Sequence, residues 1–164
     1  MKKLLLTLIL CLVWTGHTWG HGDRSELPNA AQIMQYRLLL YMTPDDPAPR
    51  NGLAMALYRT NKLEEAEGEL RYILERDPLN FDALDGLGIV LIRMERYKEA
   101  SEYLNKAVAI DEQDVMVHVH LSVLYEKMRL PEKAESELEK AKSLAAVTAE
   151  LEKIDKELEL VSGE

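Results

Sequence analysis

The chain has 164 residues, of which 47% are hydrophobic and 30% charged, values typical of one globular domain or a short solenoid. Its formal net charge is −9, and the first 20 residues carry Lys2 and Lys3 but no acid, so their loss would leave about −11. This surplus of acid argues against nucleic acid or an anionic membrane surface as the main partner. The only cysteine, Cys11, lies near the N-terminus, which excludes a disulfide or a thiolate metal site from the rest of the chain.

Residues 1–20 have the layout of a secretory signal peptide. A basic start at Lys2 and Lys3 precedes an apolar run from Leu4 to Trp14, which is short for a membrane span. Small residues follow, and cleavage after Gly20 or after Gly22 fits their spacing. We therefore expect the leader to be removed and the protein to be periplasmic or secreted, in a bacterial envelope. An uncleaved membrane anchor is the alternative.

Two segments connect this leader to the body of the chain. Residues 21–29 are mostly polar and contain Pro28, which predicts a flexible joint. Residues 30–46 carry apolar side chains at helical spacing and end in the turn residues Asp45 and Asp46. We interpret them as an N-terminal capping helix that covers the unit after it.

A pattern of 34 residues then occurs three times without an insertion. The three copies are residues 47–80, 81–114 and 115–148. In the middle copy Leu84, Leu87 and Leu91 lie on one face of a helix, and a second amphipathic helix begins near Tyr97. Neither helix alone buries enough apolar area to offset its ordering cost, so the copies must stack.

This pattern resembles the tetratricopeptide repeat, a helix–turn–helix unit that stacks into a solenoid. The middle copy keeps Leu87 with Gly88, and the pair Ala100 and Leu104. The resemblance implies an all-α solenoid of about three repeats, with a half-repeat helix at the N-terminus and a capping helix at the C-terminus. Its small signature residues are Ala66, Gly88, Ala100 and Ala134. Such a solenoid implies an adaptor or scaffold that binds other proteins.

Residues 149–164 form the C-terminal segment. No Gly or Pro intervenes between Pro131 and Val161, and apolar residues recur at steps of three and four. We expect a capping helix that shields the last repeat, with a frayed tail, and the sequence leaves open whether a break falls near Ala146. The alternative is a homo-oligomer joined through Leu151, Ile154 and Leu158.

The sequence contains little that could perform chemistry. It has no glycine-rich phosphate loop, no nucleophile elbow and no paired-histidine zinc motif. His118 and His120 are two residues apart on a predicted helix, so they point in different directions and cannot share a metal ion. His118 is expected to pack between helices. We expect no enzyme activity, no cofactor and no metal site. A copper site at His21, if cleavage made it the N-terminus, is a distant alternative.

In this family the first helix of each repeat lines a concave groove, and the resemblance places these residues there: Asn51, Met55, Tyr58, Arg59, Asp82, Asp85, Ile89, Ile92, Arg93, Met116, Val119, Val123 and Lys127. The middle of this set is apolar, while Arg59, Arg93 and Lys127 recur every 34 residues as a basic column. An apolar floor favours an amphipathic helix or an extended segment of another protein. The alternative is that the chain's own ends cover the floor.

The co-chaperone members of the family hold an acidic C-terminus with a Lys, Asn and Arg clamp. The matching positions here are Asn51, Met55, Gly86, Met116 and His120. These side chains cannot form that clamp. The groove is therefore expected to bind a different kind of segment, and no nucleic acid. Contact with a membrane is expected only through an uncleaved leader, and a homodimer is possible.

Overall fold

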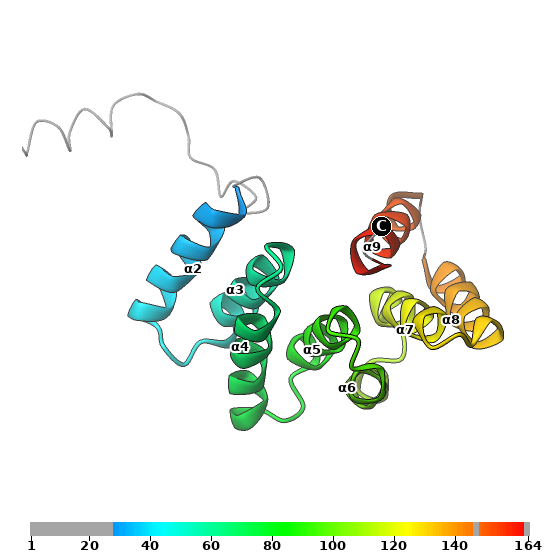
Figure 1. Ribbon diagram of the computed structural model, residues 1–164, viewed down its shortest axis with the longest axis horizontal. Helices are drawn as coiled ribbons and strands as arrows, with labels where there is room; N and C mark the ends of the chain where they lie inside the picture. Colours follow the sequence, from blue (N-terminus) through cyan, green and yellow to red (C-terminus); the bar gives the residue numbers. More distant parts are fainter. Residues whose placement is uncertain (1–27, 146–147, 163–164) are drawn as a thin grey trace, which may run out of the picture.

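The computed structural model describes residues 28–145 and 148–162, and this part of the chain is all α-helical. Its helices are α2 (Asn29–Met42), α3 (Pro47–Arg59), α4 (Leu63–Arg76), α5 (Phe81–Arg93), α6 (Tyr97–Ile110), α7 (Val115–Lys127), α8 (Pro131–Leu144) and α9 (Thr148–Ser162). Figure 1 shows them side by side along the long axis of the molecule, from α2 at one end to α7 and α8 at the other. The predicted solenoid of helix pairs is confirmed.

The first helix of every repeat begins at the same phase and with the same kind of cap. Asp46, Asn80 and Asp114 precede α3, α5 and α7, and each side chain accepts a hydrogen bond from a backbone N–H of the first turn. The distances are 3.0, 3.1 and 2.9 Å. Each cap satisfies an N–H group that has no partner within its helix, which is typically worth about 1 kcal/mol.

The turn between the paired helices also recurs. Asn61, Glu95 and Arg129 have φ near +60°, the left-handed region that glycine usually occupies. The N–H of Glu95 donates to the carbonyl of Ile92, and the next N–H donates to the carbonyl of Leu91. The other two turns have the same pair of bonds, the Schellman arrangement that closes a helix end. The two helices of each repeat are therefore joined by the same backbone conformation.

The core runs between the helices of each pair and between neighbouring pairs. Ala66, Ala100 and Leu104 are fully buried, whereas Ala134, in the last repeat, is only half-buried. A Cβ atom on Gly88 would lie 2.5 Å from the side chain of Leu104. The small residues of the first two full repeats therefore lie where α5 and α6, or their equivalents, approach most closely.

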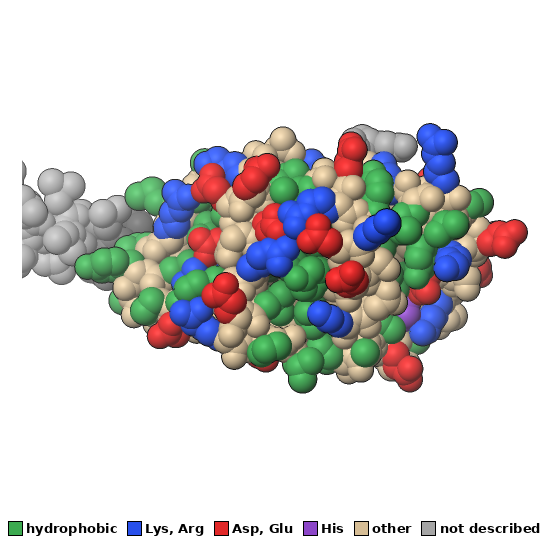
Figure 2. Space-filling model, turned by 60° about the horizontal axis from the view of Figure 1, so that its bottom comes forward, with side chains coloured by type: hydrophobic (Ala, Val, Ile, Leu, Met, Phe, Trp, Pro, Cys, Tyr) green, Lys and Arg blue, Asp and Glu red, His purple; other side chains and the backbone are tan. Residues whose placement is uncertain are grey.

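The second helices form the outer surface, where charged side chains link neighbouring repeats. Glu67 of α4 accepts hydrogen bonds from Arg71 at 2.7 Å and from Arg96 at 2.6 Å, and Arg96 also pairs with Glu99. Partial burial alone would raise the pKa of Glu67, but the two guanidinium groups outweigh it and hold that pKa below its ordinary value. Figure 2, with the lower side of Figure 1 brought forward, shows acidic and basic side chains mixed over this face.

Helix α2 occupies the position predicted for the second helix of an incomplete repeat. It packs on α3, with Gln32 and Ile33 buried and Tyr36 beside Gly52. Its outer side leaves four large apolar side chains exposed, namely Met34, Leu38, Tyr41 and Met42. Hydrophobic side chains are visible at this end of the molecule in Figure 2. Among the described helices, none is long and apolar enough to cross a membrane.

Candidate functional site

The first helices α3, α5 and α7 line the inner side of the row, and α9 lies on that same side (Figure 1). Helix α9 packs against α7 and also contacts α5. Helix α8 ends at Leu144 and α9 begins at Thr148, so the two are separate helices. The predicted capping helix thus packs on α7 of the last repeat, as expected, and it also reaches α5 along the inner surface.

The position of α9 decides whether the apolar floor is open to a partner or is covered by the chain's own ends. Ile89, Ile92, Val119 and Val123, which would form the floor of an open groove, are 4%, 3%, 0% and 0% exposed. They lie in the core, and α9 contributes Val161 to the cluster that contains Ile89, Ile92 and Val123. The expectation of an open apolar floor is therefore corrected, because the chain's own C-terminal helix covers these side chains.

The buried face of α9 is built from three aliphatic residues spaced four and three apart. Ile154 is 1% exposed and packs with Val119 and Ala141, Val161 is 1% exposed, and Leu158 between them is half-buried. Burying one such side chain stabilises a contact by about 1.5–3 kcal/mol. The apolar periodicity that suggested a cap or an oligomer is therefore used within the chain.

Polar groups of the inner surface hold the C-terminal end of α9. Arg93 donates to the carbonyl of Leu160 at 3.0 Å, and the hydroxyl of Tyr58 lies 3.4 Å from the same oxygen. Lys127 donates to the carbonyl of Ser162 at 2.7 Å. The last carbonyls of a helix lack partners within it and form the negative end of its dipole, so cations stabilise them there.

Arg59, the third member of the predicted basic column, has a different role. Its guanidinium donates to the side chains of Gln32 and Asn29 on α2. The column is thus divided between two helices. Arg93 and Lys127 bind the end of α9, and Arg59 ties the N-terminal half-repeat to α3.

His120 of α7 links that helix to α5 and to α9. Its Nδ1 lies 2.7 Å from Asp85 of α5, and its Nε2 lies 3.1 Å from Glu157 of α9. Burial alone would lower the pKa of His120, but the two carboxylates outweigh it and raise that pKa to about 10. His120 is therefore a cation at neutral pH that donates to both carboxylates. Sequence reasoning placed Asp85 in the groove but gave no signal for Glu157.

The other buried histidine is separate from this cluster. His118 is 1% exposed, its Nδ1 lies 2.7 Å from Glu137 of α8, and its Nε2 lies 3.1 Å from the carbonyl of Glu112. The prediction that it packs between helices is confirmed. Within the two described ranges, no group of three or more His, Cys, Asp and Glu side chains is arranged to hold a metal ion.

Part of the inner surface stays accessible on the N-terminal side of α9. Asp82 and Arg59 are exposed, and Asn51, Met55 and Met116 are half-buried. The amide oxygen of Asn51 is enclosed without a hydrogen-bond partner among the described residues. Of the thirteen predicted groove residues, these five are exposed or half-buried, but Arg59 is bonded to α2 and Met116 packs against the cluster that contains Ile154. The other eight mostly lie in the core or contact α9.

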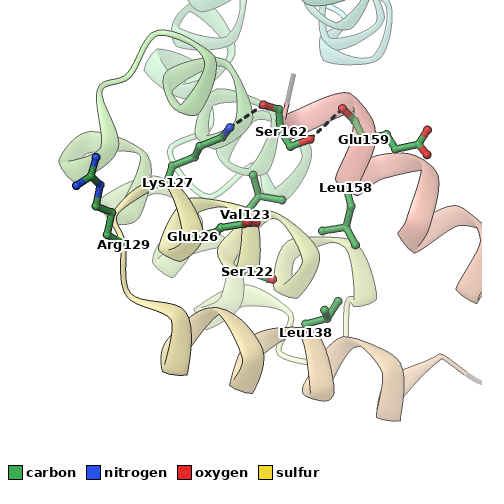
Figure 3. A pocket seen from close by; sticks show the side chains of 9 residues that line it. All are labelled: Ser122, Val123, Glu126, Lys127, Arg129, Leu138, Leu158, Glu159 and Ser162. Atoms are coloured by element: carbon green, nitrogen blue, oxygen red, sulfur yellow. Dashed lines mark hydrogen bonds between the residues drawn. The ribbon is translucent and has the colours of Figure 1, made fainter. Parts of the chain in front are cut away.

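A hollow of about 510 Å³ lies between α7, α8 and α9. Figure 3 shows Val123, Leu138 and Leu158 toward it, with Lys127 bonded to the end of α9 at its margin. The remaining lining residues are Ser122, Glu126, Arg129, Glu159 and Ser162. The hollow is open to solvent, and charged side chains line its margin. Helix α9 therefore meets α8 only near Ile154 and Ala141 and leaves a gap toward α8 along the rest of its length.

Several predictions fall outside the described residues. They are the leader and its cleavage after Gly20 or Gly22, the copper alternative at His21, and the role of Leu151, whose side chain is not described. They remain predictions.

Comparisons with known proteins agree with the repeat fold. Residues 81–114 and residues 117–148 each match a family model described as tetratricopeptide repeat. No curated protein sequence matches the chain.

Three solved structures illustrate the likeness in fold. A thermophilic protein with these repeats from Thermus thermophilus is 22% identical with a TM-score of 0.69, over 82% of this chain and 75% of that one. MamA AMB-1 is 25% identical with a TM-score of 0.58, over 68% of this chain and 66% of its own. The translocator chaperone SycD of Yersinia enterocolitica is 20% identical with a TM-score of 0.62, over 71% and 89%. The chain thus spans about two thirds of the MamA structures it matches.

Proposed function

The chain is a tetratricopeptide-repeat protein, and on this premise we propose that it is an adaptor of the bacterial envelope that holds a helical or extended segment of another protein on its inner surface. Repeats of this kind, and neighbours in fold such as MamA and a secretion chaperone, support a role as a protein-interaction scaffold. The location in the envelope is supported by the pattern of residues 1–20 alone.

The observation that carries this proposal is that the inner surface already binds a helix. Helix α9 is held there by aliphatic contacts, by the ion pair between His120 and Glu157, and by cations on its last carbonyls. A surface that provides an apolar strip with polar groups at its margin is the kind that receives amphipathic helices. The accessible part beside it, around Met55 and Asp82, is where a partner segment would make first contact.

Little supports the alternative, which is a homo-oligomer joined through the C-terminal helix. Ile154, the central residue of the proposed seam, is 1% exposed within its own chain. A dimer seam needs that side chain on the outside. An oligomer that keeps α9 in place would have to use another surface.

Site-specific photo-cross-linking in intact cells tests the adaptor role. A photoreactive residue at Met55 or at Asp82, on the inner side, should give a covalent adduct with one defined protein. The matched controls are Glu102 and Lys106, which are exposed on the second helix α6. Equal adducts from both sides, or none from the inner side, would contradict the proposal.

A further inference from the structure

The placement of α9 indicates which kind of helix the inner surface recognises. Part of the recognition uses backbone atoms only, because Arg93, Lys127 and Tyr58 contact the carbonyls of Leu160 and Ser162. Every helix presents such unpaired carbonyls at its C-terminal end. This end of the site therefore fixes the direction of a bound helix without reading its sequence.

Two other features of the inner surface contact the side chains of the bound helix and therefore select for its sequence. The strip formed by Val119, Val123 and Ile92 takes aliphatic residues spaced four and three apart, as Ile154, Leu158 and Val161 are. Between them Glu157 reaches Nε2 of His120, whose Nδ1 is already occupied by Asp85. A helix without a carboxylate at that position would leave a buried cationic N–H unpaired, which is costly. The site thus favours an acidic amphipathic helix.

The same helix is poorly placed to serve only as a structural cap. A cap for the last repeat alone would pack on α7 and α8, whereas α9 packs mainly on α7 and also contacts α5. It meets α8 at one end, where Ile154 packs with Ala141, and beyond that point a hollow of about 510 Å³ separates the two helices. Helix α8 ends at Leu144 and α9 begins at Thr148, so the short linker keeps α9 near the site at a high effective concentration. Any helix from outside must compete with it.

We propose that α9 is an internal occupant of the partner site, and that the partner displaces it with a helix of the same chemistry. That helix has aliphatic residues at α9-like spacing, a carboxylate facing His120 and its C-terminal carbonyls toward Arg93 and Lys127. This inference rests on the proposed function, because it names the kind of segment that the adaptor takes.

Binding of a labelled peptide to the full chain tests the inference. The probe is a fluorescein-labelled peptide of residues 146–164, followed by fluorescence anisotropy. Ile154→Asp removes the main anchor of α9 and leaves the site itself unchanged. We expect this variant to bind the probe at least tenfold more tightly than the unsubstituted chain, because the site is then open for a larger fraction of the time.

Two matched controls make the result specific. Lys153→Asp introduces the same side chain on the exposed face of α9 and should bind the probe as weakly as the unsubstituted chain. A probe with Glu157→Lys should bind Ile154→Asp at least tenfold more weakly, whereas a probe with Glu159→Lys, changed at an exposed position, should bind almost normally. Should Ile154→Asp lose its helical circular dichroism, Leu158→Ala replaces it as the milder change.

Equal probe binding by Ile154→Asp, Lys153→Asp and the unsubstituted chain would overturn the inference and leave α9 a structural element. Sedimentation of the unsubstituted chain as a dimer that the probe converts to a monomer would also overturn it, by assigning the site to α9 of a second copy. If probe binding fails while cross-links still form from Met55 and Asp82, only this inference falls. If those cross-links also fail, the adaptor role falls with it.

Discussion

His120 has a structural role that could not be predicted from its position in the sequence. The side chain lies on the first helix α7, at one of the positions that match the carboxylate clamp of the co-chaperone members of the family. Here it is enclosed between Asp85 and Glu157, which are 35 and 37 residues away. Its charge therefore ties α5, α7 and α9 together, and stability should depend on that charge.

We predict that His120 makes the protein less stable as the pH rises. Its pKa of about 10 in the folded chain exceeds the ordinary 6.5, so its contribution is complete below pH 6.5 and is lost between pH 6.5 and about 10. The free energy of unfolding should fall by about 1 kcal/mol for each pH unit in that window. Urea unfolding between pH 6.5 and 9 should show this slope, and His120→Gln should flatten it. An unchanged slope in the variant would contradict the prediction.

At this scale, prediction from the sequence succeeded where spacing alone carries the information. Gly88 and Ala100 were identified from the repeat pattern as small signature residues. Gly88 lies where α5 and α6 approach closely, and Ala100 is fully buried. The ion pairs of His120 could not be predicted in the same way. Asp85 lies about one repeat away, but Glu157 belongs to a helix outside the repeat pattern, so no periodicity connects the two.

At the scale of single helices, glycine has opposite effects in two places. Gly88 in α5 faces Leu104, whereas Gly68 in the middle of α4 is exposed, and a Cβ atom added to it would have open space for 4 Å around it. Glycine within a helix costs about 1 kcal/mol relative to alanine. The same substitution should therefore stabilise one helix and disturb the other.

We predict that Gly68→Ala raises the free energy of unfolding by about 0.5–1 kcal/mol. Gly88→Ala should instead lower it by about 1–3 kcal/mol, because the new methyl group meets Leu104 at 2.5 Å and neither helix can withdraw freely. Thermal unfolding followed by circular dichroism measures both. Each variant serves as the control for the other, and an equal shift in the same direction would refute the assigned packing.

The helix boundaries could be predicted closely because caps and turns recur with the repeat. The first helices begin at Pro47, Phe81 and Val115, as the repeat phase required. The turns could not be predicted as closely as the helix starts. Asn61, Glu95 and Arg129 adopt a left-handed conformation, and a glycine at these positions would have indicated it. Because three different residues occupy the turn position, residue type in a single sequence does not reveal that the turn repeats.

For the whole molecule, the sequence predicted the stack but not where its last helix lies. A cap beyond α8 and a helix on the inner surface need the same aliphatic periodicity. What separates them is the match between Glu157 and His120, and between Arg93 and the end of α9. Those contacts depend on the curvature of the assembled stack, which local spacing does not specify.

We predict that α9 opens separately from the rest of the fold. It contacts the repeats along one side and has a hollow on another, so its amides should exchange with solvent through local opening, at a lower free energy than those of α5 and α7. Native-state hydrogen exchange should give α9 protection at least tenfold below that of these two helices. Lys153→Asp should leave this difference intact. Equal protection in all three would show that α9 opens only when the whole protein unfolds.

The contacts of the α9 end also limit how this chain can evolve. Tyr58, Arg93 and Lys127 come from three successive first helices, and all three meet the last turn of one helix. Duplication of a 34-residue unit would keep every cap and turn intact, yet it would move one of these side chains a full repeat farther from the other two. Gene duplication could thus lengthen the array without strain in the backbone. In the longer protein, however, the three side chains could no longer all contact the C-terminal end of α9.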